Sequence, residues 1–181
     1  MERMTLSQKW RKIKKKSIKS SVYKELVHMI KVLFVCHGNI CRSPMAEFVM
    51  KDMVQKEGLE SEFYIASAAT STEEIGNPVH RGTRNKLAQY GISVAGKHAV
   101  QLKKEDYDKY DYILGMDEMN IRNMIRIFGA DKENKVRKLL AYANNSGNIA
   151  DPWYTGNFEE TYQDVTEGCR VLLEYICNKK I

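Results

Sequence analysis

Apolar residues gather in short runs along the chain, and the spacing within each run predicts a strand or a helix. Ile30–Val35 (IKVLFV) is an almost continuous apolar run. Glu62–Ala68 (EFYIASA) and Tyr110–Met116 (YDYILGM) predict two more strands, Val136–Leu140 predicts a short fourth one, and His98–Leu102 predicts a short extended piece. Because parallel sheets are covered by helices on both faces, their strands carry such apolar runs, and a parallel sheet is expected.

Helical spacing, in which apolar residues recur every three or four positions, separates these strands. Gly91 is the expected C-cap of one helix and Asp117 the expected N-cap of another, whereas Asp151–Asn157 is expected to be a Pro/Gly loop. Strands that alternate with helices predict one α/β domain with a central, about four-stranded parallel sheet flanked by helices. The expected helices are Pro44–Lys56, Pro78–Tyr90, Asp117–Phe128 and Phe158–Asn178.

The positive charge of the chain is concentrated in its first 28 residues. These contain nine Lys or Arg and two Glu, whereas the rest of the chain carries 20 basic and 21 acidic side chains. We expect residues 1–28 to be a basic leader, either disordered or an extension upstream of a start at Met29, and residues 29–181 to be the domain. Contact of the leader with an anionic membrane is a less favoured alternative, and no nucleic-acid partner is expected for the domain, whose charge is nearly balanced.

Composition narrows the class of protein further. No stretch approaches 18 consecutive apolar residues, so no membrane span is expected. The four cysteines are too few and too unevenly spaced for a disulfide framework, and no Cys/His quartet has the spacing of a zinc site. A cytoplasmic protein without a metal site is therefore expected.

The segment VLFVCHGNICRSP places a small-residue loop between the first strand and the first helix. In an open parallel sheet ligands bind at this edge, and backbone N–H groups at a helix N-terminus bind phosphate. Gly38 and Asn39 tolerate left-handed backbone conformations, Pro44 suits a first helical turn, and Arg42 can hold two phosphate oxygens. The same surroundings favour the thiolate of Cys36, so the loop pairs a nucleophile with an oxyanion cradle.

The spacing Cys-x5-Arg-Ser near the N-terminus of an α/β domain resembles the low-molecular-weight protein-tyrosine-phosphatase family. The resemblance extends from about Ile30 to the C-terminus and includes SAATSTEEIGNP, YDYILGMDEMN and ADPWY. It implies a phosphatase that hydrolyses phosphotyrosine and small aryl phosphates through a cysteinyl-phosphate, without a cofactor. A phosphotyrosine-containing protein is the implied substrate, with a bacterial tyrosine kinase as one candidate.

The resemblance also implies roles for individual residues. Cys36, Arg42 and Asp151 are the catalytic set, with Asp151 as general acid and then general base. Ser43 matches a hydroxyl that hydrogen-bonds the thiolate, and Asn39 matches a residue that holds the loop in a strained shape. The implied phosphate-binding loop comprises His37, Gly38, Asn39, Ile40, Cys41, Arg42 and Ser43.

Other positions are implied to act around this centre. Trp153 and Tyr154 match an aromatic wall of the pocket, and Glu73 stands where some relatives have an aromatic residue lining the cleft. Cys41 matches a second cysteine that can form a reversible disulfide with Cys36, although packing alone is the alternative role. His98 matches a position of structural hydrogen bonding near the loop.

Three alternatives remain at this stage. A protein-arginine phosphatase of the same fold is the nearest, but such relatives tend to have Thr in place of Ile40 and a glycine-containing DP loop. An arsenate reductase would need a further cysteine pair, and no cysteine lies between Cys41 and Cys169. A non-catalytic phosphopeptide-binding module would be expected to lack the nucleophile or the acid.

Overall fold

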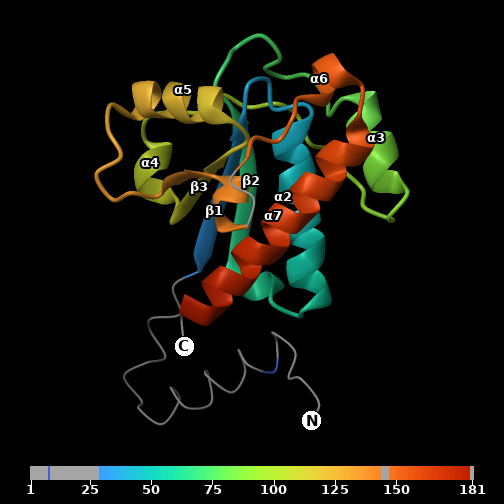
Figure 1. Cartoon of the computed structure of the whole chain (residues 1–181), viewed down its shortest axis with the longest axis horizontal. Helices are drawn as coiled ribbons and strands as arrows, with labels where there is room; N and C mark the ends of the chain where they lie inside the picture. The colour runs from blue at the N-terminus through green and yellow to red at the C-terminus, as the bar shows by residue number, and fades with distance from the viewer. Residues whose placement is uncertain (1–7, 9–28, 144–146, 180–181) are drawn as a thin grey trace.

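A four-stranded parallel sheet forms the centre of the computed structural model, which describes residues 8, 29–143 and 147–179 (Figure 1). The strand order is β2-β1-β3-β4, and in the register Cys36 of β1 faces Ala69 of β2. The carboxyl ends of the central strands therefore meet at one edge of the sheet. The strands are β1 (Ile30–Cys36), β2 (Phe63–Ala69), β3 (Tyr112–Gly115) and β4 (Val136–Lys138).

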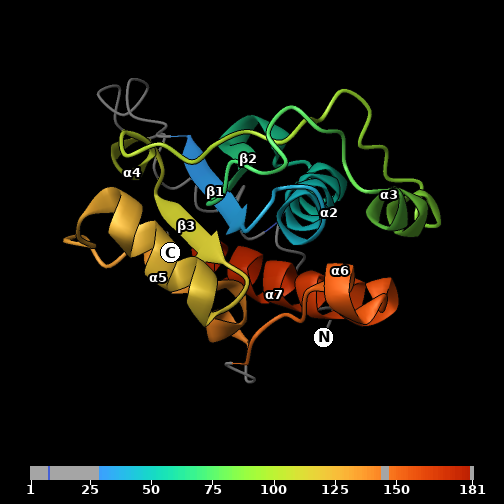
Figure 2. The same cartoon turned by 90° about the horizontal axis from the view of Figure 1, so that it is seen from above.

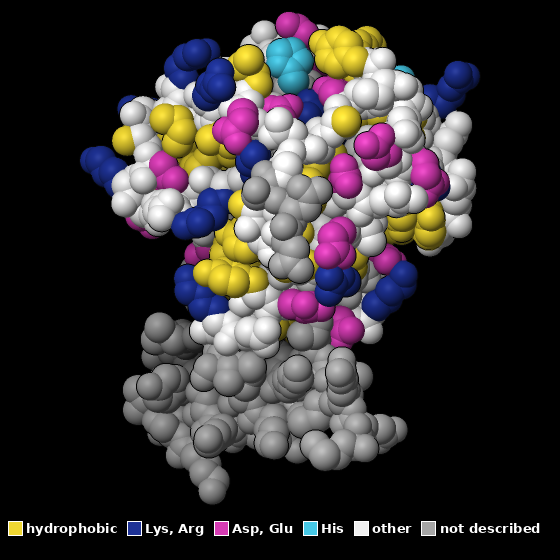
Figure 3. Space-filling model, in the orientation of Figure 1, with side chains coloured by type: hydrophobic (Ala, Val, Ile, Leu, Met, Phe, Trp, Pro, Cys, Tyr) yellow, Lys and Arg dark blue, Asp and Glu magenta, His cyan; other side chains and the backbone are white. Residues whose placement is uncertain are grey.

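Helices cover both faces of this sheet, as the parallel arrangement requires. Seen from above, α2 and α7 lie on one side of the strands, and α4 and α5 lie on the other (Figure 2). The face of the molecule seen in the orientation of Figure 1 carries a mixture of acidic and basic side chains (Figure 3). The helices are α2 (Arg42–Lys56), α3 (Arg81–Ala88), α4 (Asp106–Lys109), α5 (Glu118–Phe128), α6 (Pro152–Thr155) and α7 (Phe158–Lys179).

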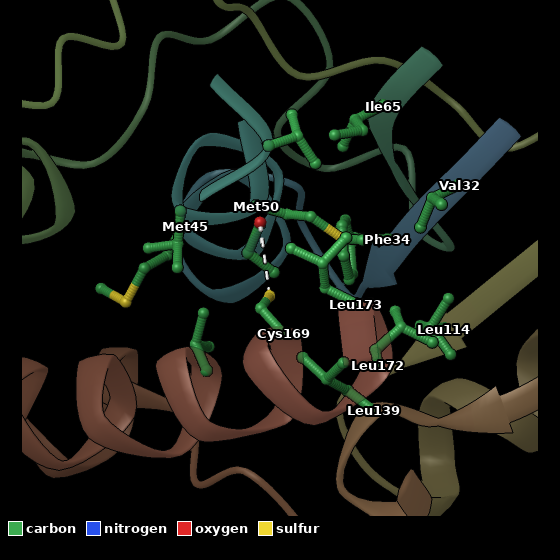
Figure 4. Packing of buried hydrophobic residues seen from close by; sticks show 14 of the residues in the cluster. Val32, Phe34, Met45, Met50, Ile65, Leu114, Leu139, Cys169, Leu172 and Leu173 are labelled. Carbon is green, nitrogen blue, oxygen red and sulfur yellow. Dashed lines mark hydrogen bonds between the residues drawn. The ribbon is translucent and has the colours of Figure 1, made fainter. Parts of the chain in front are cut away.

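The core has one cluster on each face because successive side chains of β1 point to opposite sides. Val32 and Phe34 pack in the cluster formed with α2 and α7, whereas Leu33 and Val35 pack in the cluster formed with α5. Figure 4 shows the first cluster, in which the Cys169 thiol donates to the carbonyl oxygen of Ala46 at 3.7 Å. Helices α2 and α7 therefore bury one face each against the sheet, and Cys169 is a core residue.

Several boundaries differ from the sequence-based expectations. The predicted strand Val136–Leu140 ends at Lys138, because Leu139 and Leu140 are buried in a 3-10 turn (Leu139–Tyr142). The predicted helix Pro78–Tyr90 is shorter and spans Arg81–Ala88; its C-cap is Gln89, and Gly91 (φ 72°) turns the chain afterwards.

The expected Pro/Gly loop contains a helix. Asp151 caps α6 by accepting from the N–H of Trp153, Pro152 occupies its first turn, and Gly156 (φ 68°) ends it in the left-handed conformation. Helix α4 was not expected either. Each has four residues, too short to show an apolar period.

The leader expected at residues 1–28 lies outside the described residues, apart from residue 8. Within the described ranges, no helix combines the length and the apolar character needed to cross a bilayer.

Candidate active site

Four segments that lie far apart in the sequence meet at the carboxyl edge of the sheet. The chain after β2 joins the chain after β1 through a hydrogen bond from the N–H of Thr70 to the carbonyl oxygen of Cys36 (2.9 Å). The segment before α6 joins the end of β3 through a bond from the N–H of Ile149 to the carbonyl oxygen of Met116 (2.8 Å). These contacts bring Asp151 next to the loop that follows β1.

A pocket of about 110 Å³ opens where these segments meet. Its size suits a phosphoryl group with part of its ester rather than a large ligand. A wider hollow of about 540 Å³ lies beside α3, but its lining contains neither a cysteine nor a carboxylate. The small pocket is lined by Cys36, His37, Gly38, Ile40, Cys41, Arg42, Glu73, Glu74, Asp151, Trp153 and Tyr154.

Cys36 lies at the end of β1 and is 3% exposed. Its Sγ atom lies 3.0 Å from Oγ of Ser43 and accepts from the N–H of Asn39 at 3.3 Å. Both contacts come from the loop and from the first turn of α2. These contacts fix the position of the sulfur at the pocket.

Asn39 holds the turn of the loop from the inside. Its φ is 59°, in the left-handed region, and its side chain is fully buried. Nδ2 donates to Oγ of Ser43 and to Oγ of Ser67, both at 2.8 Å, and Oδ1 accepts from the N–H of Val100 at 3.1 Å. Gly38, in contrast, does not have a positive φ. A Cβ there would lie 3.1 Å from Cγ of Glu74, so Gly38 provides room rather than a left-handed turn.

Arg42 is a buried cation at the pocket, with a side chain only 4% exposed. Nη1 donates to Oδ2 of Asp117 (2.6 Å) and to the carbonyl oxygen of Ile149 (3.1 Å), and Nη2 donates to Oδ2 of Asp151 (2.5 Å). Burial alone would lower the pKa of Arg42, but the negative charges of Cys36, Asp151 and Asp117 raise it above its ordinary value. Nε is buried without a partner among the described residues, so one donor remains available for an oxyanion.

Asp117 makes two contacts, one within α5 and one at the pocket. Its Oδ1 accepts from the N–H of Asn120 at 2.7 Å, which confirms the predicted N-cap of α5. Its Oδ2 binds Arg42 and so reaches the pocket.

The two carboxylate oxygens of Asp151 have different partners, one in α6 and one on Arg42. Oδ1 accepts from the N–H of Trp153 at 3.1 Å, and Oδ2 binds Arg42. The following aromatic residues stand at the mouth of the pocket: Trp153 is 57% exposed and Tyr154 is 84% exposed. They offer open ring faces against which an aromatic ester can pack.

Two acidic residues share the lining of the pocket with these aromatic residues. Glu73 and Glu74 line the pocket, and Oε2 of Glu73 lies 3.1 Å from Nε2 of His37. Both partners of this contact are well exposed, so it contributes little to stability. Figure 3 shows hydrophobic, acidic and histidine side chains side by side at the end of the molecule near α6.

A buried polar network supports the loop from below, and sequence analysis missed it. Ser67 donates to Oε2 of Glu47 at 2.5 Å. Lys97 donates to the carbonyl oxygen of Ser67 at 3.1 Å and lies 3.5 Å from Oε2 of Glu47, while Lys51 contacts the other oxygen of that carboxylate. Burial lowers the pKa of Lys97, and the charge of Glu47 opposes that effect. The network continues through Asn39 to Ser43, next to the sulfur of Cys36.

Two further positions complete the comparison with the sequence. Cys41 is buried as a free thiol, and burial, together with the charges of Cys36 and Asp151, raises its pKa to about 12. The expectation for His98 was wrong. Its ring is exposed and pairs with the carbonyl oxygen of Gly96 in its own turn (3.2 Å), and it is Val100 that bonds the loop.

Comparisons with known proteins agree with this geometry. Residues 31–181 match the model of the family described as "Low molecular weight phosphotyrosine protein phosphatase". The Bacillus subtilis protein "Low molecular weight protein-tyrosine-phosphatase YfkJ" is 44% identical over 154 residues, which cover 84% of this chain and 99% of that protein. The crystal structure of YfkJ matches with a TM-score of 0.81 over 84% of this chain and 98% of that one.

More distant relatives share the fold. The chicken (Gallus gallus) "Low molecular weight phosphotyrosine protein phosphatase" is 41% identical over 148 residues, covering 79% of this chain and 93% of that protein. The crystal structure of DARP, named as a Drosophila arginine phosphatase, is 28% identical, with a TM-score of 0.75 over 81% of this chain and 98% of that one.

Proposed function

The chain belongs to the low molecular weight phosphotyrosine protein phosphatase family, and from this premise we propose that it hydrolyses phosphotyrosine in proteins through a cysteinyl-phosphate. The observation that best supports this proposal is the placement of three groups in one small pocket. Sγ of Cys36 lies 3.0 Å from Oγ of Ser43, and Arg42 and Asp151 line the same cavity.

Substrate binding exchanges the partners of Arg42. In the structure its guanidinium is held by the carboxylates of Asp117 and Asp151. A phosphoryl dianion in the pocket takes over donors of Arg42, including the free Nε, together with backbone N–H groups of the loop.

In the first chemical step the Cys36 thiolate attacks phosphorus. The S–P bond forms as the bond from phosphorus to the tyrosyl oxygen breaks, and protonated Asp151 gives its proton to that oxygen. The protein leaves with its tyrosine side chain dephosphorylated, and the phosphoryl group stays on sulfur. Asp151 reaches this position because it caps α6 at the pocket mouth.

In the second step water hydrolyses the intermediate. The Asp151 carboxylate takes a proton from a water molecule, whose oxygen attacks phosphorus as the S–P bond breaks. Cys36 leaves as a thiolate and phosphate is released. Oγ of Ser43 already accepts from Nδ2 of Asn39, so its O–H can donate a hydrogen bond to the departing thiolate and keep its proton.

The lining of the pocket supports an aromatic ester over phosphoarginine. Ile40 presents an apolar side chain where arginine phosphatases of this fold tend to have Thr. Trp153 and Tyr154 provide the ring faces on which a phenyl ester stacks. An arsenate reductase is a poorer fit, because Cys169 is fully buried in the core and cannot relay electrons to the pocket.

Cys41 has a proposed redox role. It lines the pocket beside Cys36, and both are free thiols. Oxidation of Cys36 to a sulfenic acid would let Cys41 displace water and form a disulfide, which protects the nucleophile from irreversible oxidation. Mass spectrometry of peroxide-treated protein should show the Cys36–Cys41 disulfide. After the same peroxide treatment, the activity of Cys41→Ser should be lost and should not return when a thiol reductant is added.

We also place the enzyme in the cytoplasm, where its cysteines stay reduced. Its expected partners are phosphotyrosine-containing proteins, with a bacterial tyrosine kinase as one candidate.

The proposed function is tested by comparing turnover of matched peptides that carry phosphotyrosine, phosphoarginine or phosphoserine. We expect the highest kcat/KM with phosphotyrosine and no turnover in Cys36→Ser. A higher kcat/KM with phosphoarginine would transfer the assignment to the arginine phosphatases, and turnover by Cys36→Ser would remove the mechanism.

A further inference from the structure

His80 contacts both the phosphate-binding loop and the helix that follows Asp151. It precedes α3 as its N-cap, and its backbone N–H donates to the carbonyl oxygen of Ile40, in the phosphate-binding loop, at 2.8 Å. Its Nδ1 accepts from the N–H of Gly82 at 3.1 Å. An accepting nitrogen carries no proton, so this geometry assigns the ring proton to Nε2.

The ring of His80 lies between two aromatic side chains. It stacks on Phe158 with centroids 5.4 Å apart and planes 7° apart, and it meets Trp153 edge-on at 5.6 Å and 69°. A Cβ on Gly82 would lie 2.3 Å from the ring of Phe158, so the glycine makes room for the stack. Figures 1 and 2 both show α3, α6 and the first turn of α7 converging at this end of the molecule.

The contact with Trp153 leads directly to the acid. Trp153 donates its backbone N–H to Oδ1 of Asp151, within the four-residue helix α6. That helix is otherwise weakly held, because Trp153 and Tyr154 are mostly exposed and only Pro152 is buried. Outside α6, the acid loop (residues 149–151) is tied by the bond of Asp151 to Arg42, by a 3.4 Å bond from Oγ1 of Thr161 to the carbonyl oxygen of Ala150, and by the bonds of Ile149 to Met116 and Arg42.

When substrate takes over Arg42, the acid loop loses one of these ties. We propose that His80 is a positioning residue that then keeps Asp151 at the pocket by holding Trp153 against α3 and α7. The inference rests on the proposed function, since it concerns the proton that Asp151 gives to the leaving oxygen.

The chemistry of the leaving group separates this role from a purely structural one. A phenolate that leaves unprotonated is a poor leaving group, whereas 4-nitrophenolate leaves readily without a proton. Misplacing the general acid therefore slows phenyl phosphate far more than 4-nitrophenyl phosphate. General destabilisation or a damaged loop slows both esters together.

Two variants divide the functions of the His80 side chain. His80→Asn keeps an acceptor for the N–H of Gly82 but removes the ring, and His80→Phe keeps a ring but removes the acceptor. Phe158→Leu removes the stacking partner without touching His80. His98→Asn is the matched control, because that histidine is exposed and bonded within its own turn.

The experiment measures kcat/KM for both esters, and Tm, in each variant. We expect His80→Asn and Phe158→Leu to lower kcat/KM for phenyl phosphate about tenfold more than for 4-nitrophenyl phosphate. His80→Phe should keep the wild-type ratio with a lower Tm, and His98→Asn should match the wild type.

An unchanged ratio in His80→Asn, with wild-type Tm, would overturn the inference while leaving the proposed function intact. If His80→Asn does not fold, Phe158→Leu provides the test. An unchanged ratio of the two kcat/KM values in that variant would overturn the inference. A wild-type protein that hydrolyses neither ester would overturn both the inference and the proposed function.

Discussion

Replacing Asn39 with alanine should loosen the loop that holds the nucleophile. The change removes three side-chain hydrogen bonds, to Ser43, Ser67 and Val100, at a fully buried position. Each is worth about 1 kcal/mol net. Alanine also tolerates the observed φ of 59° less well than asparagine, which adds about 1 kcal/mol. We therefore expect the free energy of unfolding to fall by about 3–4 kcal/mol.

The assay is urea unfolding of the wild type, Asn39→Ala and Asn39→Gly, combined with calorimetric titration of vanadate. Glycine fits the left-handed conformation without strain but makes none of the three bonds, so it should be about 1 kcal/mol less destabilised than alanine. Both variants should bind vanadate more weakly, because Ser43 and the N–H of residue 39 lose their fixed positions. If Asn39→Ala has wild-type stability and vanadate affinity, the account of the loop is refuted. If Asn39→Gly is no more stable than Asn39→Ala, the argument for backbone strain at residue 39 is refuted.

The other predictions concern the acid and the buried titratable groups. Asp151→Asn should lower kcat/KM for phenyl phosphate by about 10²–10³-fold, because it removes the proton donor, while calorimetric phosphate affinity changes little; full turnover would contradict the assignment. Burial raises the pKa of Cys41 to about 12 and that of Tyr142 to about 12, so above about pH 9 the unfolded chain releases protons that the folded protein keeps. The free energy of unfolding should therefore fall as pH rises from about 9 to about 11. Lys97 opposes this trend, because its pKa is lowered in the folded protein. Urea midpoints that stay level over this pH range would contradict the prediction.

The elements with long or unbroken apolar patterns could be predicted from the sequence. Ile30–Val35 became β1 because its side chains are buried on both faces of the sheet, and the apolar stripe of Phe158–Asn178 became α7. Short elements escaped prediction. Helix α6 depends on a cap from Asp151 and a left-handed Gly156, and neither produces an apolar period.

The loop at Cys36 could be predicted because its residues are adjacent in sequence, but its supports could not. Asp151 is 109 residues from Arg42, and the residue pattern alone marked it only as a turn residue before a proline. Glu47 and Lys97 look like ordinary surface charges in the sequence. Their burial depends on each other and on Ser67, so it follows only from the assembled fold.

The most direct test of the central claim is to trap the covalent intermediate. Protein mixed with excess 4-nitrophenyl phosphate is quenched in acid during turnover, digested and analysed by mass spectrometry, with Cys36→Ser as the control. The account predicts a phosphoryl group on the peptide that carries Cys36 in the wild type and none on that peptide in the variant. A phosphoryl group on another residue, or wild-type turnover that never labels Cys36, would contradict it.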